Sequence, residues 1–115
     1  MARLRPEHDF QCAVKQFADL HQLPMLHIAN EGRRSPMEGA RLKKMGMHPG
    51  ASDCFFLRSN EQYKGLWLEL KIKPNKPTPN QLMFLNLVIS EGYHGLVSYD
   101  LDHALGVIRE FYGIR

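Results

Sequence analysis

Segment 66–72, Leu-Trp-Leu-Glu-Leu-Lys-Ile, carries the residues whose types and spacing are best suited to chemistry. Side chains alternate across a β-strand, so Glu69 and Lys71 lie on one face and the leucines beside them lie on the other. A rigid strand therefore holds a carboxylate and an amine side by side. On its own this pair is weak evidence, because a Glu-x-Lys ion pair on an exposed strand usually contributes little.

A second carboxylate, Asp53, lies at the start of the preceding strand-like segment, 54–57. The polar stretch 59–64 predicts a hairpin turn, and if the turn is centred on Glu61, Asp53 and Glu69 are each eight residues from its centre. That register places the two carboxylates opposite each other on the same face, whereas a slip of one residue would separate them. Carboxylates about 5 Å apart repel unless a cation lies between them, and oxygen ligands of this kind suit Mg²⁺.

The rest of the chain predicts the elements that position this carboxylate pair, from helical and strand-like apolar spacing. Thr78 and Gln81 form the Thr-x-x-Gln pattern of a capping box, and Pro79 suits the first position of the helix that follows. The predicted order is helix 6–22, strand 25–29, short basic helix 37–45, strands 54–57 and 66–72, helix 79–91, strand 96–99 and helix 102–112. One mixed α/β domain over residues 1–115, a single sheet flanked by helices, follows from this order.

The composition leaves room for nucleic acid as a partner without requiring it. The 115 residues include 15 Lys and Arg against 12 Asp and Glu, a net charge of +3. Cys12 and Cys54 form no Cys-x-x-Cys motif and the six histidines show no His-x-x-x-His spacing, which disfavours a structural zinc site and a disulfide framework. We expect a reduced, intracellular compartment. No membrane span is expected, because no run of about 20 apolar residues occurs.

Taken in order, the motifs resemble the VRR-NUC branch of the PD-(D/E)xK nuclease superfamily. The matching pieces are Gly-Met-His-Pro-Gly-Ala-Ser-Asp at 46–53, Gly-Leu-Trp-Leu-Glu-Leu-Lys at 65–71, and Pro-Asn-Gln at 79–81 before a helix that ends in Glu-Gly-Tyr at 91–93. Upstream, Glu7 with Gln11 and Asn-Glu-Gly-Arg at 30–33 also match. Ser52 stands where the family name has Pro, so the match is to a pattern rather than to every letter.

The resemblance implies a restriction-endonuclease-like α/β fold, a mixed sheet flanked by helices with an αβββαβ core, and a metal-dependent DNA nuclease. In such a nuclease Asp53 and Glu69 bind Mg²⁺ or Mn²⁺, and the carbonyl oxygen of Leu70 supplies a further ligand. Lys71 positions or activates the attacking water, while the metal polarises a phosphoryl oxygen.

Two further site residues and a set of basic contacts follow from the same resemblance. We expect Glu7 to serve a second ion or to hold a water. Gln81 would act in the same way from the start of its helix, although its capping-box role is an adequate structural explanation for it. Each basic residue near the site is by itself better explained as a solvated charge, but their clustering on segments that flank the site predicts phosphate contacts with DNA. These residues are Arg33, Arg34, Arg41, Lys43, Lys44, Lys73 and Lys76.

The helix predicted after Pro79 is apolar nearly all round, and such a helix is normally buried on most sides. Its apolar residues are Leu82, Met83, Phe84, Leu85, Leu87, Val88 and Ile89. In so small a domain this predicts a homodimer, unless the N- or C-terminal helix of the same chain covers the surplus apolar surface.

A two-fold dimer offers two sites for symmetrical cuts. We therefore expect a structure-specific endonuclease that resolves four-way (Holliday) junctions in branched DNA, in the cytoplasm of a bacterial or phage-infected cell. The alternatives are a flap or non-specific DNA nuclease, and a catalytically inactive nucleic-acid-binding module. The joint presence of Asp53, Glu69 and Lys71 speaks against the inactive module.

Overall fold

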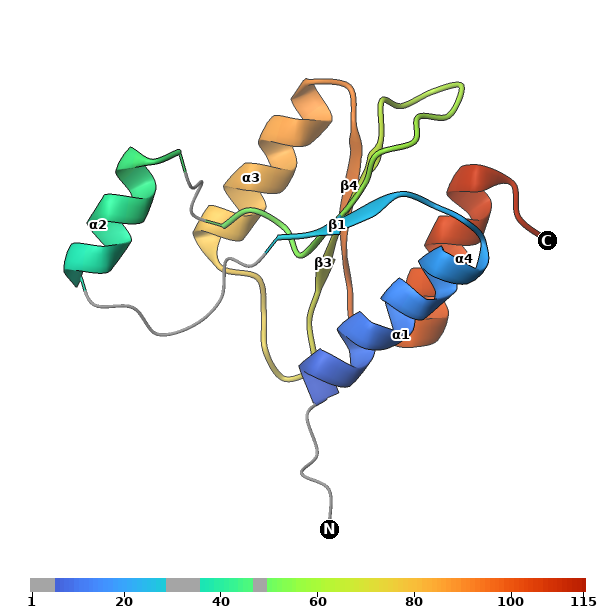
Figure 1. Ribbon diagram of the computed structural model, residues 1–115, viewed down its shortest axis with the longest axis horizontal. Coiled ribbons are helices and arrows are strands. Elements are labelled where there is room, and N and C mark those ends of the chain that lie inside the picture. The colour runs from blue at the N-terminus through green and yellow to red at the C-terminus, as the bar shows by residue number, and fades with distance from the viewer. Residues whose placement is uncertain (1–5, 29–35, 47–49) are drawn as a thin grey trace, which may run out of the picture.

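The computed structural model describes residues 6–28, 36–46 and 50–115 of the chain. Within these residues the chain forms helices around a four-stranded sheet (Figure 1). The elements are α1 Pro6–Leu20, β1 Met25–His27, α2 Pro36–Lys44, β2 Cys54–Phe56, β3 Leu66–Leu70, α3 Pro79–Ser90, β4 His94–Ser98 and α4 Leu101–Tyr112. This is the predicted order, and the mixed sheet flanked by helices confirms the predicted fold class.

The sheet has the strand order β1-β2-β3-β4 and mixes both kinds of pairing. β1 with β2 and β2 with β3 are antiparallel, whereas β3 and β4 are parallel and are joined through α3. A parallel pair needs such a crossover, because a tight turn can join only antiparallel strands. In β2 and β3, Cys54 pairs with Leu68 and Phe56 with Leu66, so the hairpin is centred on Glu61 as predicted.

The helices cover the two faces of the sheet unequally. α1 and α4 pack together on one face, and α3 lies on the other (Figure 1). The main core forms under α1 and α4, where alternate residues of β3, Leu66, Leu68 and Leu70, meet apolar side chains of both helices. The alternation predicted for β3 therefore decides which side chains build the core and which face α3.

Helix α3 is covered on one side only. Phe84, Leu85 and Val88 are buried, whereas four other apolar residues are between 47% and 67% exposed: Leu82, Met83, Leu87 and Ile89. Within the single chain the helix is therefore not buried on most sides, and burial by a second copy stays a prediction. The idea that a terminal helix covers the surplus is wrong, because α1 and α4 pack on the opposite face of the sheet.

Strand β4 begins at His94, two residues before the predicted start at position 96. The difference arises at Gly95, since glycine is a poor strand former by itself. A Cβ atom at Gly95 would lie 3.1 Å from Cδ2 of Leu85 and 3.2 Å from Cγ2 of Val88. The glycine thus lets β4 approach α3 closely, which is a tertiary reason that local propensity does not reveal.

No helix among the described residues is long and apolar enough to cross a membrane.

Candidate functional site

Asp53 and Glu69 are both buried, 5% and 1% exposed, at the end of the β2–β3 hairpin remote from its turn. The register of the two strands, continued one residue beyond the Cys54–Leu68 pair, places the two carboxylates opposite each other. This agrees with the arrangement expected from the sequence. Burying two carboxylates is costly unless hydrogen bonds or cations compensate them, so the groups around them matter.

The backbone holds Asp53 from two sides. Its Oδ2 accepts a hydrogen bond of 2.7 Å from the backbone N–H of Leu70, and its carbonyl oxygen accepts one of 2.8 Å from that of Ile28. Among the described residues, no lysine or arginine forms an ion pair with Asp53. The Asp53 carboxylate is thus oriented by β3 itself, with no described cationic side chain to neutralise it.

An open cleft of about 560 Å³ lies beside Asp53, between the start of α1 and the ends of β1 and β3. Asp53 and Leu70 line it from the sheet, and Glu7 and Gln11 line it from α1. The structure therefore brings the predicted residues Glu7, Asp53 and Leu70 to one cleft. Glu69 is not among the described residues that line it, because it is buried one position back on β3.

Lys71 follows β3 directly and is half-buried. Its backbone N–H donates a hydrogen bond of 2.9 Å to the carbonyl oxygen of Ser98, which extends the pairing of β3 with β4 by one residue. Strand alternation then gives Lys71 the same side of the sheet as Glu69. The predicted carboxylate thus lies on β3 and the predicted amine directly after it.

Gln81 is engaged in the predicted capping box at the start of α3. Its Oε1 accepts a hydrogen bond of 2.8 Å from the backbone N–H of Thr78, and its own N–H donates one of 3.2 Å to Thr78 Oγ1. Gly50, at φ +82°, packs against this turn, where a Cβ would meet the Asn80 carbonyl carbon at 2.4 Å. The start of α3 is therefore fixed to the loop that leads into Asp53, and the Gln81 side chain already holds the helix end.

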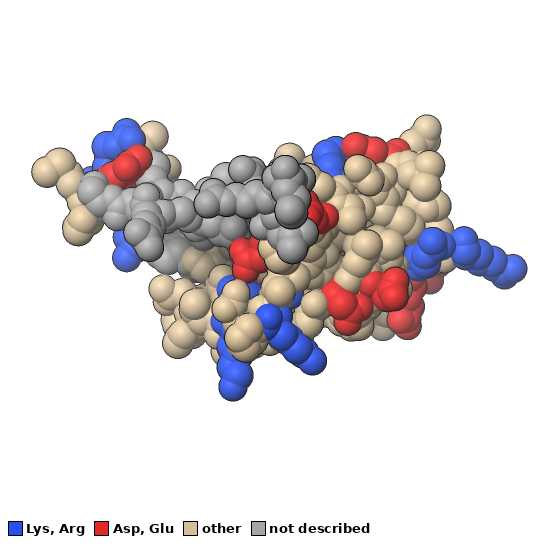
Figure 2. All heavy atoms as spheres, turned by 90° about the horizontal axis from the view of Figure 1, so that it is seen from below, with Lys and Arg blue, Asp and Glu red and all other residues tan. Residues whose placement is uncertain are grey.

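The predicted phosphate-binding residues divide into two groups. Lys73 and Lys76 are exposed on the connection from β3 to α3, and the Nζ of Lys73 lies 6.0 Å from the Tyr99 ring centroid. Arg41, Lys43 and Lys44 are on α2, which stands apart from α1 beyond α3 (Figure 1). Arg33 and Arg34 lie outside the described residues. Figure 2 shows basic and acidic side chains on the same face of the molecule rather than one continuous basic surface.

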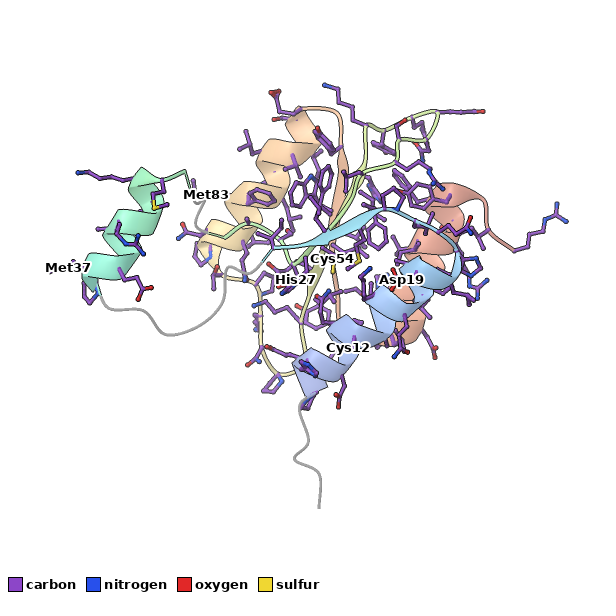
Figure 3. All side chains as sticks on the ribbon, viewed as in Figure 1. Cys12, Asp19, His27, Met37, Cys54 and Met83 are labelled. Carbon is purple, nitrogen blue, oxygen red and sulfur yellow. The ribbon has the colours of Figure 1, made fainter. Side chains whose placement is uncertain are left out.

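Sequence reasoning missed two polar residues of the cleft, His27 and Asn75. His27 Nδ1 lies 3.2 Å from the carbonyl oxygen of Asp53, and Asn75 Nδ2 donates a hydrogen bond of 3.5 Å to Glu7 Oε1. His27 reaches the site because β1 pairs with β2 in a register that sets His27 against Cys54 (Figure 3). No sequence signal gave that register, since 26 positions separate His27 from Asp53.

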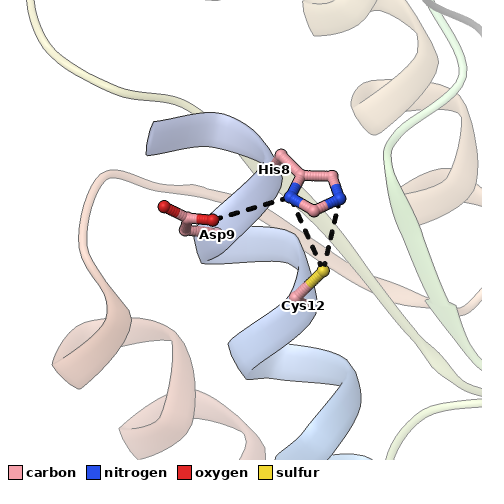
Figure 4. Close-up of polar contacts among 3 residues, drawn as sticks. All are labelled: His8, Asp9 and Cys12. Carbon is pink, nitrogen blue, oxygen red and sulfur yellow. Dashed lines mark hydrogen bonds and ion pairs between the residues drawn. The ribbon is translucent and has the colours of Figure 1, made fainter. Parts of the chain in front are cut away.

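His8 stands at the rim of the cleft but its polar contacts lie on the outer surface of α1 (Figure 4). Its Nδ1 is 3.5 Å from Asp9 Oδ1, and its Nε2 is 3.7 Å from the Sγ of Cys12 one helical turn later. The His8 and Asp9 side chains are more than 60% exposed, and contacts of this kind on an exposed helix contribute little. We therefore assign His8 to the rim and not to the chemistry of the cleft.

Metal binding here would rest on few side chains. Among the described residues, no three His, Cys, Asp or Glu side chains gather closely enough to hold one metal ion. The residues present are a pair of carboxylates, Asp53 and Glu69, with the backbone of Leu70 beside them. Such an oxygen donor set fits Mg²⁺ or Mn²⁺, which keep several waters, and does not fit a closed zinc site.

The strand order, the crossover through α3 and the helices on both faces define a restriction-endonuclease-like α/β fold. A solved structure described as a "VRR_NUC domain protein" superposes with a TM-score of 0.79 over 98% of this chain and 93% of that chain, at 24% sequence identity. At that identity the likeness shows the fold, and it confirms the architecture that the motifs predicted. No family model matches the chain, and no curated protein matches it in sequence.

Proposed function

We propose that this chain is a divalent-metal-dependent DNA nuclease of the VRR-NUC family, which hydrolyses phosphodiester bonds. One observation carries the proposal. Two buried carboxylates occupy opposite positions on adjacent antiparallel strands, with Lys71 two residues after one of them and a cleft beside the other. The fold shared with a VRR_NUC domain protein supports the same conclusion.

Asp53, Glu69 and the carbonyl oxygen of Leu70 would hold Mg²⁺ or Mn²⁺. The ion supplies positive charge that polarises a phosphoryl group. The backbone N–H of Leu70 keeps one oxygen of Asp53 oriented by a bond of 2.7 Å, so the carboxylate is positioned before any ligand arrives. Their burial strengthens this role, because charges interact more strongly away from water.

Three other side chains would assist. The Lys71 ammonium group, on the same side of the strand as Glu69, orients the attacking water or balances the charge of the phosphate. Glu7 faces the cleft from α1, where Asn75 donates to it, and would serve a second ion or hold a water. Gln81 would likewise serve a second ion or hold a water, from the start of α3. Its backbone N–H and side chain also stabilise that helix end.

The substrate we propose is branched DNA, and specifically the four-way junction. Lys73 and Lys76 on the β3–α3 connection would bind phosphates near the cleft, and the basic residues of α2 would bind a more distant part of the DNA. Arg33 and Arg34 would add to these contacts.

The exposed apolar side of α3 supports a homodimer. Four side chains on this short helix, Leu82, Met83, Leu87 and Ile89, are about half exposed or more, which is unfavourable for an isolated domain. Pairing of two copies across a two-fold axis would cover both patches and fix the distance between two clefts. A four-way junction has matching strands related by a similar axis, so one dimer would cut both.

The direct test is cleavage of labelled four-way, flap and duplex DNA side by side in Mg²⁺, in Mn²⁺ and in EDTA. We expect paired, symmetrical cuts in the four-way junction that require the divalent ion. Preference for the flap, or equal cutting of all three, would replace junction resolution by the alternative nucleases. Absence of cutting together with absence of Mn²⁺ binding would identify an inactive nucleic-acid-binding module.

The Lys71→Ala variant distinguishes the role of the amine from that of the metal ligands. An ammonium group is not a ligand for a cation, so this variant should bind Mn²⁺ as the wild type does while its cleavage rate falls on the order of 10²-fold. Calorimetric titration with Mn²⁺ and single-turnover cleavage measure the two properties. Loss of metal binding in a folded Lys71→Ala protein would contradict the assigned role.

A further inference from the structure

Gln11 connects the buried end of β2 to the cleft. It lies on α1, lines the cleft and is partly buried. Its Oε1 is 3.3 Å from the Sγ of Cys54, a residue with no solvent exposure that follows Asp53 directly. The Gln11 side chain thus contacts β2 at its first residue, directly after one of the proposed metal ligands.

In this contact the thiol of Cys54 is the donor and the amide oxygen of Gln11 is the acceptor. A thiol S–H donates to an oxygen atom, so the amide oxygen of Gln11 is turned toward Cys54 and the sheet. The amide nitrogen lies on the other side of the same carbon and is therefore turned away from the Cys54 thiol, on a residue that lines the cleft. Among the described residues, none accepts a hydrogen bond from the Gln11 Nε2. Two N–H donors are consequently available to a ligand in the cleft.

The carboxylates of the cleft explain why a donor is needed there, beside a ring nitrogen of His27 and the amide of Asn75 that already contact Asp53 and Glu7. Glu7 and Asp53 present carboxylates, which accept hydrogen bonds and repel an anion. A DNA phosphodiester is an anion whose non-bridging oxygens need donors. A neutral amide N–H₂ group supplies donors without changing the charge of the metal site, and it sits on a helix rather than on a flexible loop.

We propose that the Gln11 Nε2 donates a hydrogen bond to a non-bridging oxygen of the DNA phosphodiester in the cleft. The Cys54 thiol acts as the positioning group that keeps the amide in this orientation. The inference rests on the proposed nuclease function and names one contact between that site and its substrate. It makes Gln11 a substrate-binding residue, whereas Cys54 acts only through Gln11.

The test uses the full chain carrying Lys71→Ala, in Mg²⁺, so that binding of a fluorescent four-way junction is measured by anisotropy without appreciable cleavage. Gln11→Glu keeps the side-chain shape and the oxygen that accepts from Cys54, but replaces the donors with a charged acceptor. We expect binding about tenfold or more weaker, the effect of losing a hydrogen bond to a charged group. Gln16→Glu makes the same charge change at an exposed position of α1 and should alter binding less than about twofold.

Cys54→Ala provides the second arm, because it removes the group that orients the amide. Binding should weaken by a few-fold when Gln11 is present and should not weaken further when position 11 is Glu. Such non-additivity is the signature of one residue acting through another. A purely structural role of Cys54 would lower stability equally in both backgrounds and leave this difference in binding at zero.

A third measurement needs no change at position 11 or position 54. The side-chain N–H₂ signal of Gln11, assigned in the Lys71→Ala protein by through-bond NMR experiments, should shift as the junction is added. A signal that stays unmoved at saturating DNA, or a folded Gln11→Glu protein that binds like its parent, overturns the inference while leaving the nuclease proposal intact. Failure of the Lys71→Ala parent itself to bind any DNA overturns the nuclease proposal and the inference with it.

Discussion

The two faces of the sheet are built from similar apolar residues but differ in how completely they are closed. Under α1 and α4 the core is sealed, with Val14, Leu66, Leu68 and Ile108 fully buried. On the other face α3 is the one described helix that packs on β3 and β4, and its far side remains exposed. Asp53 and Glu69 lie at the end of β2 and β3, beside both of these packed regions.

This difference indicates a division of labour. The closed face gives rigidity, because tightly packed side chains hold β2 and β3 in one register and fix the positions of the two carboxylates. The open face leaves apolar surface that a second copy would cover. The described part of the chain therefore separates the face that positions the carboxylates from the face that we propose for assembly.

Removal of either carboxylate should have the largest effect. Asp53→Ala or Glu69→Ala should abolish Mn²⁺ binding and reduce cleavage on the order of 10³-fold or more. Mutation of a residue that only supports a metal ligand already lowers metal affinity or activity about 10–100-fold, so loss of the ligand itself should cost more. Calorimetry and single-turnover cleavage of the junction measure the two effects, with the circular dichroism spectrum as a check of folding. Either variant cutting DNA at the wild-type rate would show that the metal site is assigned to the wrong residues.

Charged substitutions on the exposed apolar side of α3 should have the next largest effect. The double change Met83→Asp and Leu87→Asp places charges on the exposed side of α3 and should raise the dissociation constant of the dimer by more than about tenfold. Sedimentation velocity at micromolar concentration measures this, and paired cutting of the junction should be lost with the dimer. Leu20→Asp, at another exposed apolar position but on α1, is the control and should leave the dimer intact. A wild-type monomer that still makes paired, symmetrical cuts would break the proposed link between α3 and function.

The local parts of this arrangement were predictable from the sequence. The alternation in β3 and the hairpin centred on Glu61 place Asp53 opposite Glu69, and the structure has that register. The capping box of Thr78 and Gln81 is likewise present. In each case the partners are close in sequence or joined by one short turn, so spacing alone constrains them.

The parts that escaped prediction depend on contacts across long loops or on tertiary packing. His27 meets Asp53 only because β1 pairs with β2, and the two strands are separated by a long connection that includes α2. The side of α3 that remains exposed depends on where α1 and α4 pack, which helical periodicity in α3 cannot reveal. The contact between Cys54 and Gln11 was hidden for the same reason, as 43 positions separate them.

The contact between Gly50 and the start of α3 joins the loop before Asp53 to that helix, and its loss should cost stability. Gly50→Ala combines a positive φ of +82° with a Cβ placed 2.4 Å from the Asn80 backbone, so we expect a loss of about 2–4 kcal/mol in the free energy of unfolding. Gly46→Ala has a similar positive φ of +100° but meets no described atom within 4 Å, and should cost about 1 kcal/mol. Urea denaturation of both variants compares them. Equal losses would show that the close approach to α3 contributes nothing.

The smallest predicted effect is on DNA binding by the basic residues. It should distinguish those on the β3–α3 connection from those on α2. Lys73 and Lys76 lie on the connection that leads from the cleft to α3, whereas Arg41 and Lys43 lie on α2, away from α1. Each phosphate contact releases counterions, so removing one lysine that touches the backbone lowers the slope of log affinity against log salt by about one. We expect Lys73→Ala with Lys76→Ala to lower the slope by about two and to weaken binding alike for all DNA sequences, because phosphate contacts carry no base information.

Arg41→Ala with Lys43→Ala should lower the slope only for a branched substrate long enough to reach α2, and a short duplex should not detect the change. Anisotropy titrations at several salt concentrations, on a short duplex and on a four-way junction, measure all four slopes. Sequence-selective weakening would indicate base readout, and an unchanged slope for the pair on the β3–α3 connection would remove these lysines from the DNA-binding surface.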